Sequence, residues 1–239
     1  MPDTVVCLLG MHRSGTSCLS GSLQRAGLFL GKYHTWNHHN HAGNRENPDI
    51  VLLNEAILKA NGGDWDCPPT RVDWREEHRW RAREILDMYA EAPIWGFKDP
   101  RTLLTLSGWM DIVPDMRCVG IFRHPMAVTE SLHSRGGFPR HMGLFLWAYY
   151  NRILLRHWQQ QPFPMLCFDW DEETFHARLE PVLDWLHIGP LAKADRFFTP
   201  KLRNKDRQWP QELPPSIEQL YGTLKSIAAT PWQAPADAA

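Results

Sequence analysis

The sequence lacks both a long hydrophobic run and an excess of charge of either sign. No stretch approaches the ~20 consecutive apolar residues that a membrane-spanning helix needs. The apolar stretch after Asp3 lasts only a few residues and precedes no small-residue cleavage site, so no signal peptide is predicted. Lysine and arginine number 26 against 27 aspartate and glutamate, a net charge of −1. A protein that coats nucleic acid usually carries a basic excess, so a nucleic-acid partner is not expected.

Cysteine is scarce and irregularly spaced. The five cysteines form no C-x-x-C pair. Cys7, Cys118 and Cys167 lie within short apolar runs, which predicts buried, reduced thiols. Such thiols suit a reducing compartment, and we therefore expect a cytoplasmic protein.

The composition that remains is globular. Of the 239 residues, 43% are hydrophobic and 22% are charged, and a chain of this length buries a sizeable core as one domain. Residues after about 225 are rich in alanine, proline and threonine. We predict a single domain over residues 1–225 and a flexible tail over 226–239.

Strand-like and helix-like segments alternate along the chain. Short apolar runs predict strands at residues 5–9, 94–97, 117–122 and 164–168. Helical spacing, first-turn prolines and glycine stops predict helices at 16–26, 48–60, 73–89, from 125, 141–160 and 172–187. Such alternation predicts an α/β fold, a mostly parallel sheet flanked by helices.

The segment that joins the first strand to the first helix has the frame of a phosphate-binding loop. Residues 10–17 read Gly-Met-His-Arg-Ser-Gly-Thr-Ser, a G-x-x-x-x-G spacing followed by two hydroxyl side chains. Glycines let the backbone turn its N–H groups inward, and the helix that follows adds the positive end of its dipole. Thr16 stands where a nucleotide triphosphatase needs lysine, and the cation is Arg13 instead. The loop therefore predicts an anionic ligand other than magnesium–ATP.

A second anion site is predicted after the third strand. Arg123 ends that strand, Pro125 begins a helix, and Ser131 lies about two helical turns further on. An arginine at a strand end makes bidentate contacts with phosphate, and a serine on the helix contacts the same group. Together with the glycine loop, this pair predicts a ligand that carries two separate phosphates.

Four motifs resemble those of sulfotransferases that use 3′-phosphoadenosine 5′-phosphosulfate (PAPS). Residues 10–17 match the family's 5′-phosphosulfate loop, in the Arg-Ser-Gly-Thr form of many bacterial members, and residues 123–131 match its 3′-phosphate motif. Residues 97–101, Phe-Lys-Asp-Pro-Arg, are similar to the family's Lys-Asp-Pro segment. Residues 43–47 resemble the Gly-x-x-Glu segment that bacterial members place before a helix. The resemblance covers roughly residues 4–203.

This resemblance implies a P-loop-like sheet and transfer of a sulfuryl group from PAPS to an acceptor hydroxyl or amine, with adenosine 3′,5′-bisphosphate as product and no metal required. Arg123 and Ser131 are implied to bind the 3′-phosphate. Lys201 or Arg203, in a basic segment late in the chain, is expected to touch it as well. The loop residues implied to bind the donor are His12, Arg13, Ser14, Gly15, Thr16 and Ser17.

The resemblance also implies catalytic roles. Arg13 is expected to stabilise the leaving phosphate, and Lys98 is expected to be a second cation at the sulfonate. The acceptor needs a general base, for which Glu46 is the first choice and His34 the second, ahead of His12 and Asp99. The His-rich loop also contains His38, His39 and His41. No metal site is expected there, since these histidines lack helical spacing and no cysteine is nearby until Cys67.

Other functions and several acceptors stay open. A P-loop nucleotide kinase or triphosphatase is the alternative, because Asp169 follows the fourth strand as a Walker B acid does, although the loop lysine is missing. A non-catalytic module that keeps the nucleotide pocket is another. A glycan, a small hydroxyl compound and a peptide tyrosine all stay open as acceptors, because acceptor loops vary within one fold. The sequence predicts no oligomeric state.

Overall fold

A computed structural model describes residues 1–35, 43–193, 196–198 and 212–234. In this part of the chain no helix combines the length and the apolar character that crossing a membrane requires. The elements in chain order are β1 (Thr4–Leu9), α1 (Thr16–Arg25), α2 (Pro48–Ala60), α3 (Glu76–Asp87), β2 (Ile94–Lys98), α4 (Thr102–Ile112), β3 (Arg117–Phe122), α5 (Pro125–Gly136), α6 (Arg140–Gln160), β4 (Met165–Cys167), α7 (Glu172–Leu186) and α8 (Pro215–Ala229).

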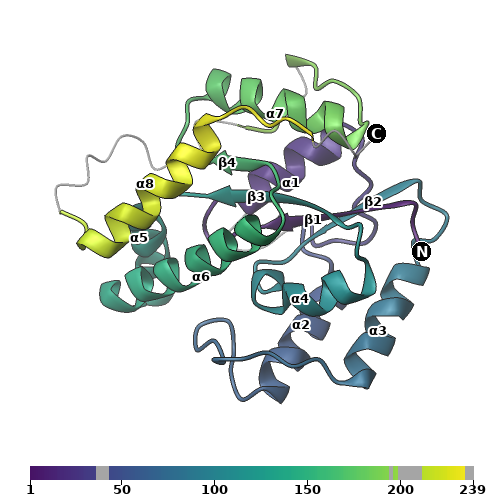
Figure 1. The fold of residues 1–239 in the computed structure, drawn as a ribbon, viewed down its shortest axis with the longest axis horizontal. Helices are drawn as coiled ribbons and strands as arrows, with labels where there is room; N and C mark the ends of the chain where they lie inside the picture. The colour runs from purple at the N-terminus through teal and green to yellow at the C-terminus, as the bar shows by residue number, and fades with distance from the viewer. Residues whose placement is uncertain (36–42, 194–195, 199–211, 235–239) are drawn as a thin grey trace.

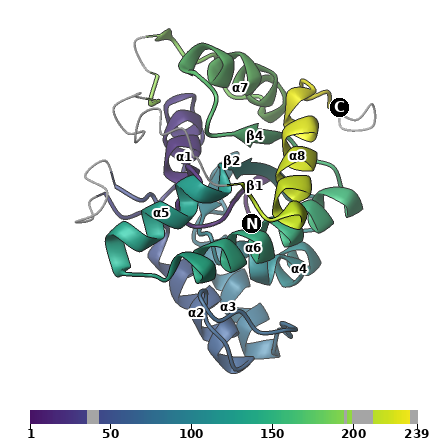
Figure 2. The same ribbon diagram turned by 90° about the vertical axis from the view of Figure 1, so that its left-hand side faces the viewer.

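The four strands form one parallel sheet in the order β2-β1-β3-β4. The chain leaves β1 toward β2 on one side and later crosses to β3 on the other side. The connections after β1 and β3 therefore run in opposite directions, and ligands of open parallel sheets bind at such a switch point, beyond the carboxyl ends of the strands. The strand arrowheads point to the left in Figure 1, so Figure 2 faces that edge. The predicted α/β class with a parallel sheet is confirmed.

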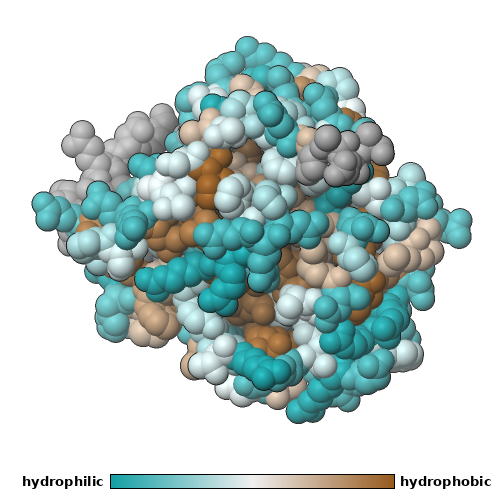
Figure 3. Space-filling model, viewed as in Figure 1, coloured by the Kyte–Doolittle hydropathy of each residue, from teal (hydrophilic) through white to brown (hydrophobic). Residues whose placement is uncertain are grey.

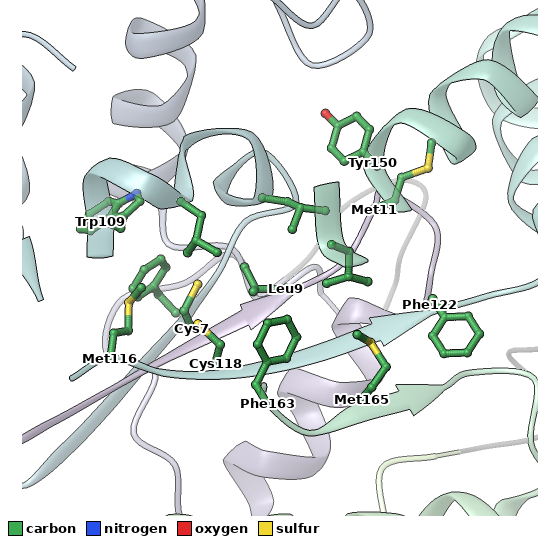
Figure 4. Packing of buried hydrophobic residues seen from close by; sticks show 14 of the residues in the cluster. Cys7, Leu9, Met11, Trp109, Met116, Cys118, Phe122, Tyr150, Phe163 and Met165 are labelled. Atoms are coloured by element: carbon green, nitrogen blue, oxygen red, sulfur yellow. The ribbon is translucent and has the colours of Figure 1, made fainter. Parts of the chain in front are cut away.

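Helices cover both faces of the sheet, as the alternation of apolar side chains along β1 requires. Val6 and Leu8 face one core with α1 and α7, while Cys7 and Leu9 face a second core with α4, α6 and α8. Figure 4 shows Cys7, Leu9 and other side chains of the second core on the same side of the strands. A strand buried on both faces reads as a continuous apolar run, and this is why the sequence revealed it.

Two helices were not predicted from the sequence. The amphipathic pattern of α4 is weak because the helix is buried on several sides; Leu103, Leu106 and Trp109 are each at most 2% exposed. The prolines at 214 and 215 start α8, as first-turn prolines do elsewhere in the chain.

The boundary expected for a flexible tail at residue 225 falls inside α8. This helix continues to Ala229, and Ala228 is buried in the second core. Beyond it, the Trp232 ring lies 5.3 Å from the ring of Trp185. Apolar contacts therefore hold residues 226–232 against the domain. The predicted helix over 73–89 is also shorter than expected and spans Glu76–Asp87.

Candidate active site

The loop after β1 is shaped by two glycines whose hydrogen atoms face other parts of the chain. A Cβ at Gly10 would lie 2.5 Å from the carbonyl oxygen of Ile121, and one at Gly15 would lie 2.4 Å from the ring of Phe168. Gly15 has a φ of 91° and Arg13 a φ of 70°, both in the left-handed region. The loop is therefore packed tightly against β3 and against the residue that follows β4. It ends at the N-terminus of α1, whose first N–H groups have no partner within the helix.

The predicted cations of the two anion motifs lie side by side. Arg13 Nε donates to Ser131 Oγ at 3.0 Å, and Arg123 Nη1 donates to the carbonyl oxygen of Arg13 at 3.4 Å. Burial, together with the charges of Arg135 and Arg123, lowers the pKa of Arg13 to about 10, although the Glu46 carboxylate opposes this shift. Positive charges this close repel one another, and an anion bound between them relieves that repulsion.

Arg123 is held from several directions at the end of β3. Its guanidinium lies 5.2 Å from the ring centre of Phe168, and its Nε lies 3.7 Å from Asp169 Oδ1. The other Asp169 oxygen accepts from the backbone N–H of His124 at 2.5 Å. The carboxylate considered as a Walker B acid is thus paired with a main-chain donor and with the arginine.

The hydroxyl groups of the loop have different surroundings. Ser14 is fully buried, and within the described chain its Oγ has no hydrogen-bond partner. Thr16 is also buried, at the first position of α1. Ser17 Oγ donates to the carbonyl oxygen of Asn44 at 3.2 Å, which ties α1 to the segment that carries Glu46.

Glu46 and Lys98, predicted from separate motifs, form an ion pair. Lys98 Nζ lies 2.8 Å from Glu46 Oε1, and Asn44 Nδ2 donates to Glu46 Oε2 at 2.7 Å. The Lys98 side chain is fully buried, whereas that of Glu46 is 15% exposed. Burial lowers the pKa of Lys98, and the Glu46 carboxylate opposes the shift. Glu46 does not cap α2, because Asn47 Oδ1 accepts from Asp49 N at 2.9 Å as the N-cap.

A buried polar network supports the end of β2. Asn54 Nδ2 donates to Asp99 Oδ2 at 2.9 Å, and Arg101 Nη1 lies 2.9 Å from the other oxygen of Asp99. Arg101 also contacts Glu55 Oε1 at 2.9 Å. Burial raises the pKa of Asp99 and the charge of Arg101 opposes this shift. Both oxygens of Asp99 therefore accept hydrogen bonds, one from Asn54 and the other from Arg101.

His12 projects from the loop toward aromatic residues. Its ring centre lies 4.6 Å from that of Trp65 and 6.3 Å from that of Tyr150. Among the described residues, His12 Nε2 has no hydrogen-bond partner. Burial lowers the pKa of His12 well below its usual range, and three neighbouring cations lower it further; these are Arg101, Lys98 and Arg13. The imidazole is therefore neutral near pH 7.

His34 lies beside Glu46 through its backbone. Its N–H donates to the carbonyl oxygen of Glu46 at 3.1 Å, while the residue itself is exposed. Within the described ranges, no group of three or more His, Cys, Asp or Glu side chains is arranged to hold a metal ion. Several predicted residues lie outside those ranges, namely His38, His39, His41, Lys201 and Arg203.

The structure adds three residues that the sequence analysis missed. Arg135 lies one helical turn beyond Ser131 and contributes to the field at Arg13. Its spacing of four from Ser131 was a usable signal, because such residues share a helix face. The other two residues are Phe168, which contacts both Gly15 and Arg123, and Asn54 in the buried network. No sequence pattern identifies them, because their partners are distant in sequence.

Replacing Gly15 by alanine is expected to destabilise the protein more than replacing Gly62. Both glycines have left-handed φ angles, 91° and 74°, but a Cβ at Gly62 meets nothing within 4 Å. Gly62→Ala should cost only the backbone strain, about 1–2 kcal/mol. Gly15→Ala should add an overpacking cost of about 1–3 kcal/mol against Phe168. Urea denaturation of the two variants measures both free energies of unfolding, and equal losses would contradict the tight packing of the loop.

Comparisons with known proteins support the fold. No family model matches the sequence, and no curated protein matches it. Among solved structures, the chain is similar to a sulfotransferase domain from the olefin synthase of Synechococcus PCC 7002, with a TM-score of 0.60. The match covers 98% of this chain and 96% of that one, at 17% sequence identity. The sheet and its flanking helices therefore share the fold of that sulfotransferase domain.

Proposed function

We propose that this chain is a sulfotransferase that uses PAPS as its sulfuryl donor. The observation that carries the proposal is the contact between Arg13, in the glycine-framed loop after β1, and Arg123, directly after the neighbouring strand β3. This is the switch point of the sheet, where ligands bind in open α/β folds. The fold likeness to a sulfotransferase domain supports the same reading.

The residues of the loop suit a ligand with anionic groups at two ends. Ser14 offers a buried hydroxyl that has no partner within the described chain, and the absence of a Cβ at Gly10 and Gly15 lets the backbone curl. Arg13 and Arg123, which lie side by side, supply positive charge at the loop. Because Thr16 replaces the lysine that grips a triphosphate, the set fits PAPS better than magnesium–ATP.

Each anionic end of the donor has its own candidates. Arg13 and the first N–H groups of α1 would hold the 5′-phosphosulfate, while Arg123 and Ser131 would hold the 3′-phosphate. When bound, PAPS supplies an activated sulfuryl group that passes to an acceptor hydroxyl or amine and leaves adenosine 3′,5′-bisphosphate. Arg13 would stabilise the negative charge on the phosphate oxygen that departs, and the reaction needs no metal in this proposal.

Glu46 would take the proton of the acceptor. Lys98 and Asn44 each donate to one of its oxygens, so the carboxylate is held in a fixed orientation near Arg13. Lys98 would add positive charge where the sulfonate binds. His34, exposed and adjacent to Glu46, is the second candidate for the base. A glycan, a small hydroxyl compound and a peptide tyrosine are the acceptor classes to screen with labelled PAPS.

Adenosine 3′,5′-bisphosphate is expected to bind with nanomolar to micromolar affinity in the absence of magnesium. The reason is that protein cations, rather than a metal ion, neutralise both phosphates. Isothermal titration calorimetry with and without a chelator measures this affinity directly. Adenosine 5′-monophosphate is the matched control and should bind more weakly, because it has no 3′-phosphate for Arg123. A strict requirement for magnesium, or tighter binding of ATP with magnesium, would overturn the proposed donor.

A further inference from the structure

A cavity lies at the opposite end of the sheet from the loop over residues 10–15. Its volume is about 700 Å³, and its lining includes Thr4 at the start of β1 and Arg117 at the start of β3. Since a strand rises about 3.3 Å per residue, the six residues of β1 separate this cavity from the loop by roughly 17 Å. A ligand in the cavity is thus too distant to contact the donor site.

The cavity has the size and the lining of a small-molecule site. Pockets for such ligands usually span about 300–1,000 Å³ and combine apolar walls with a few polar groups. Figure 3 shows hydrophobic side chains exposed among hydrophilic ones near the middle of the face drawn in Figure 1. The apolar part of the wall comes from α4, α7, the residues just before β3 and β4, and the segment after α8. It includes Leu106, Met110, Met116, Phe163, Trp185 and Trp232.

The charged groups of the lining are mostly acidic. Among the described residues, three carboxylates line the cavity, Asp3, Asp111 and Asp115, and no lysine does. Asp111 is paired with Arg79 at 3.1 Å. Arg79 lies outside the lining, whereas Arg117 belongs to it, and Arg117 Nη1 donates to the carbonyl oxygen of Trp185 at 2.6 Å. Three carboxylates against two guanidiniums leave an excess of negative charge.

Other groups of the wall are neutral, and two of them are indoles. His157 adds no positive charge near pH 7, since burial lowers its pKa. The rings of Trp185 and Trp232 lie 5.3 Å apart at 64°, and the Arg117 guanidinium already lies 5.3 Å from the Trp185 ring centre. Indole faces attract cations, and aromatic walls combined with carboxylates are how proteins recognise organic ammonium groups.

We propose that this cavity binds an organic cation with a flat apolar body, such as a protonated arylalkylamine. The apolar body would lie against Met110, Met116 and Phe163, and the ammonium group would face Asp115 and the Trp232 ring. This inference does not depend on the sulfotransferase proposal, because none of its residues belongs to the donor site.

Calorimetry with a matched pair of indoles tests the proposal. Tryptamine carries a positive charge at pH 7, and indole-3-acetate carries a negative charge on a body of similar size. We expect tryptamine to bind at least about tenfold more tightly. Asp115→Lys reverses an exposed charge and should weaken tryptamine by about tenfold or more. Glu218→Lys makes the same change in net charge on the exposed side of α8 and should have no effect.

A second variant removes the ring instead of the charge. Trp232→Ala should weaken tryptamine by about two- to thirtyfold, the usual range of a cation–π contact. Adenosine 3′,5′-bisphosphate should not displace tryptamine, because the two sites are separate. Equal binding of the two indoles, unchanged affinity in Asp115→Lys, or displacement by the bisphosphate would each overturn the proposal.

Discussion

Replacing Glu46 by glutamine is expected to lower turnover by about 10²–10⁴-fold and to leave PAPS affinity almost unchanged. Glutamine keeps the size of the side chain and one oxygen that accepts from Lys98, but it cannot take the proton of the acceptor. The buried Lys98 therefore keeps a hydrogen-bond partner. Single-turnover rates with labelled PAPS, beside calorimetry with adenosine 3′,5′-bisphosphate, measure the two quantities on the same protein.

The control for this substitution is Glu55→Gln. Glu55 is a neighbouring carboxylate on α2 that contacts Arg101 at 2.9 Å, and no catalytic role is proposed for it. Its replacement should change turnover much less than that of Glu46. Near-normal turnover in the Glu46→Gln variant would mean that Glu46 only orients Lys98. His34 would then be the candidate for the general base. His34→Asn should then abolish most of the activity.

Replacing Arg123 by alanine is expected to weaken donor binding by about 10- to 150-fold, the loss of one charged hydrogen-bond partner worth about 1.5–3 kcal/mol. The chemical step at saturating donor should be nearly unchanged, because the 3′-phosphate that Arg123 would hold does not react. Titration of the bisphosphate gives the affinity, and single-turnover kinetics at saturating PAPS gives the rate.

Arg140→Ala provides the comparison for Arg123→Ala. Arg140 is an exposed arginine on α6 that pairs with Glu130, outside the cluster formed by Arg13 and Arg123. Its loss should leave bisphosphate affinity within about twofold, the small effect typical of exposed ion pairs. A fall in the single-turnover rate with constant affinity in Arg123→Ala would instead place this arginine at the reacting group.

Local patterns were sufficient to predict the frame of the site. The apolar run of β1, the glycines at 10 and 15 and the first-turn proline at 125 each specify a short piece of backbone through nearby residues. Parallel pairing then places the ends of neighbouring strands at one edge. This is why the sequence alone predicts that Arg13 and Arg123 face one ligand.

The side-chain pairings needed the structure. Glu46 and Lys98 are 52 positions apart. Nothing in either motif indicates that the Glu46 carboxylate pairs with the Lys98 ammonium group. The same holds for Asn54, which lies 45 positions from Asp99. The cavity at the end of the sheet where β1 and β3 begin is lined by even more widely separated segments, including Asp3 and Trp232. Long-range packing decides such contacts, and single-sequence periodicity carries no information about it.

The contact between Arg13 and Ser131 has a consequence for how the protein folds. It joins residues 118 positions apart, and the bond from Arg123 to the Arg13 carbonyl spans 110. Chains whose contacts are distant in sequence fold slowly, because the entropy of closing large loops is lost before those contacts form. The cluster of Arg13 and Arg123 cannot form until β1 has paired with β3, and the β2 segment lies between these two strands in the sequence. A nascent chain that ends before residue 131 would therefore carry the glycine loop but could not form the contact between Arg13 and Ser131.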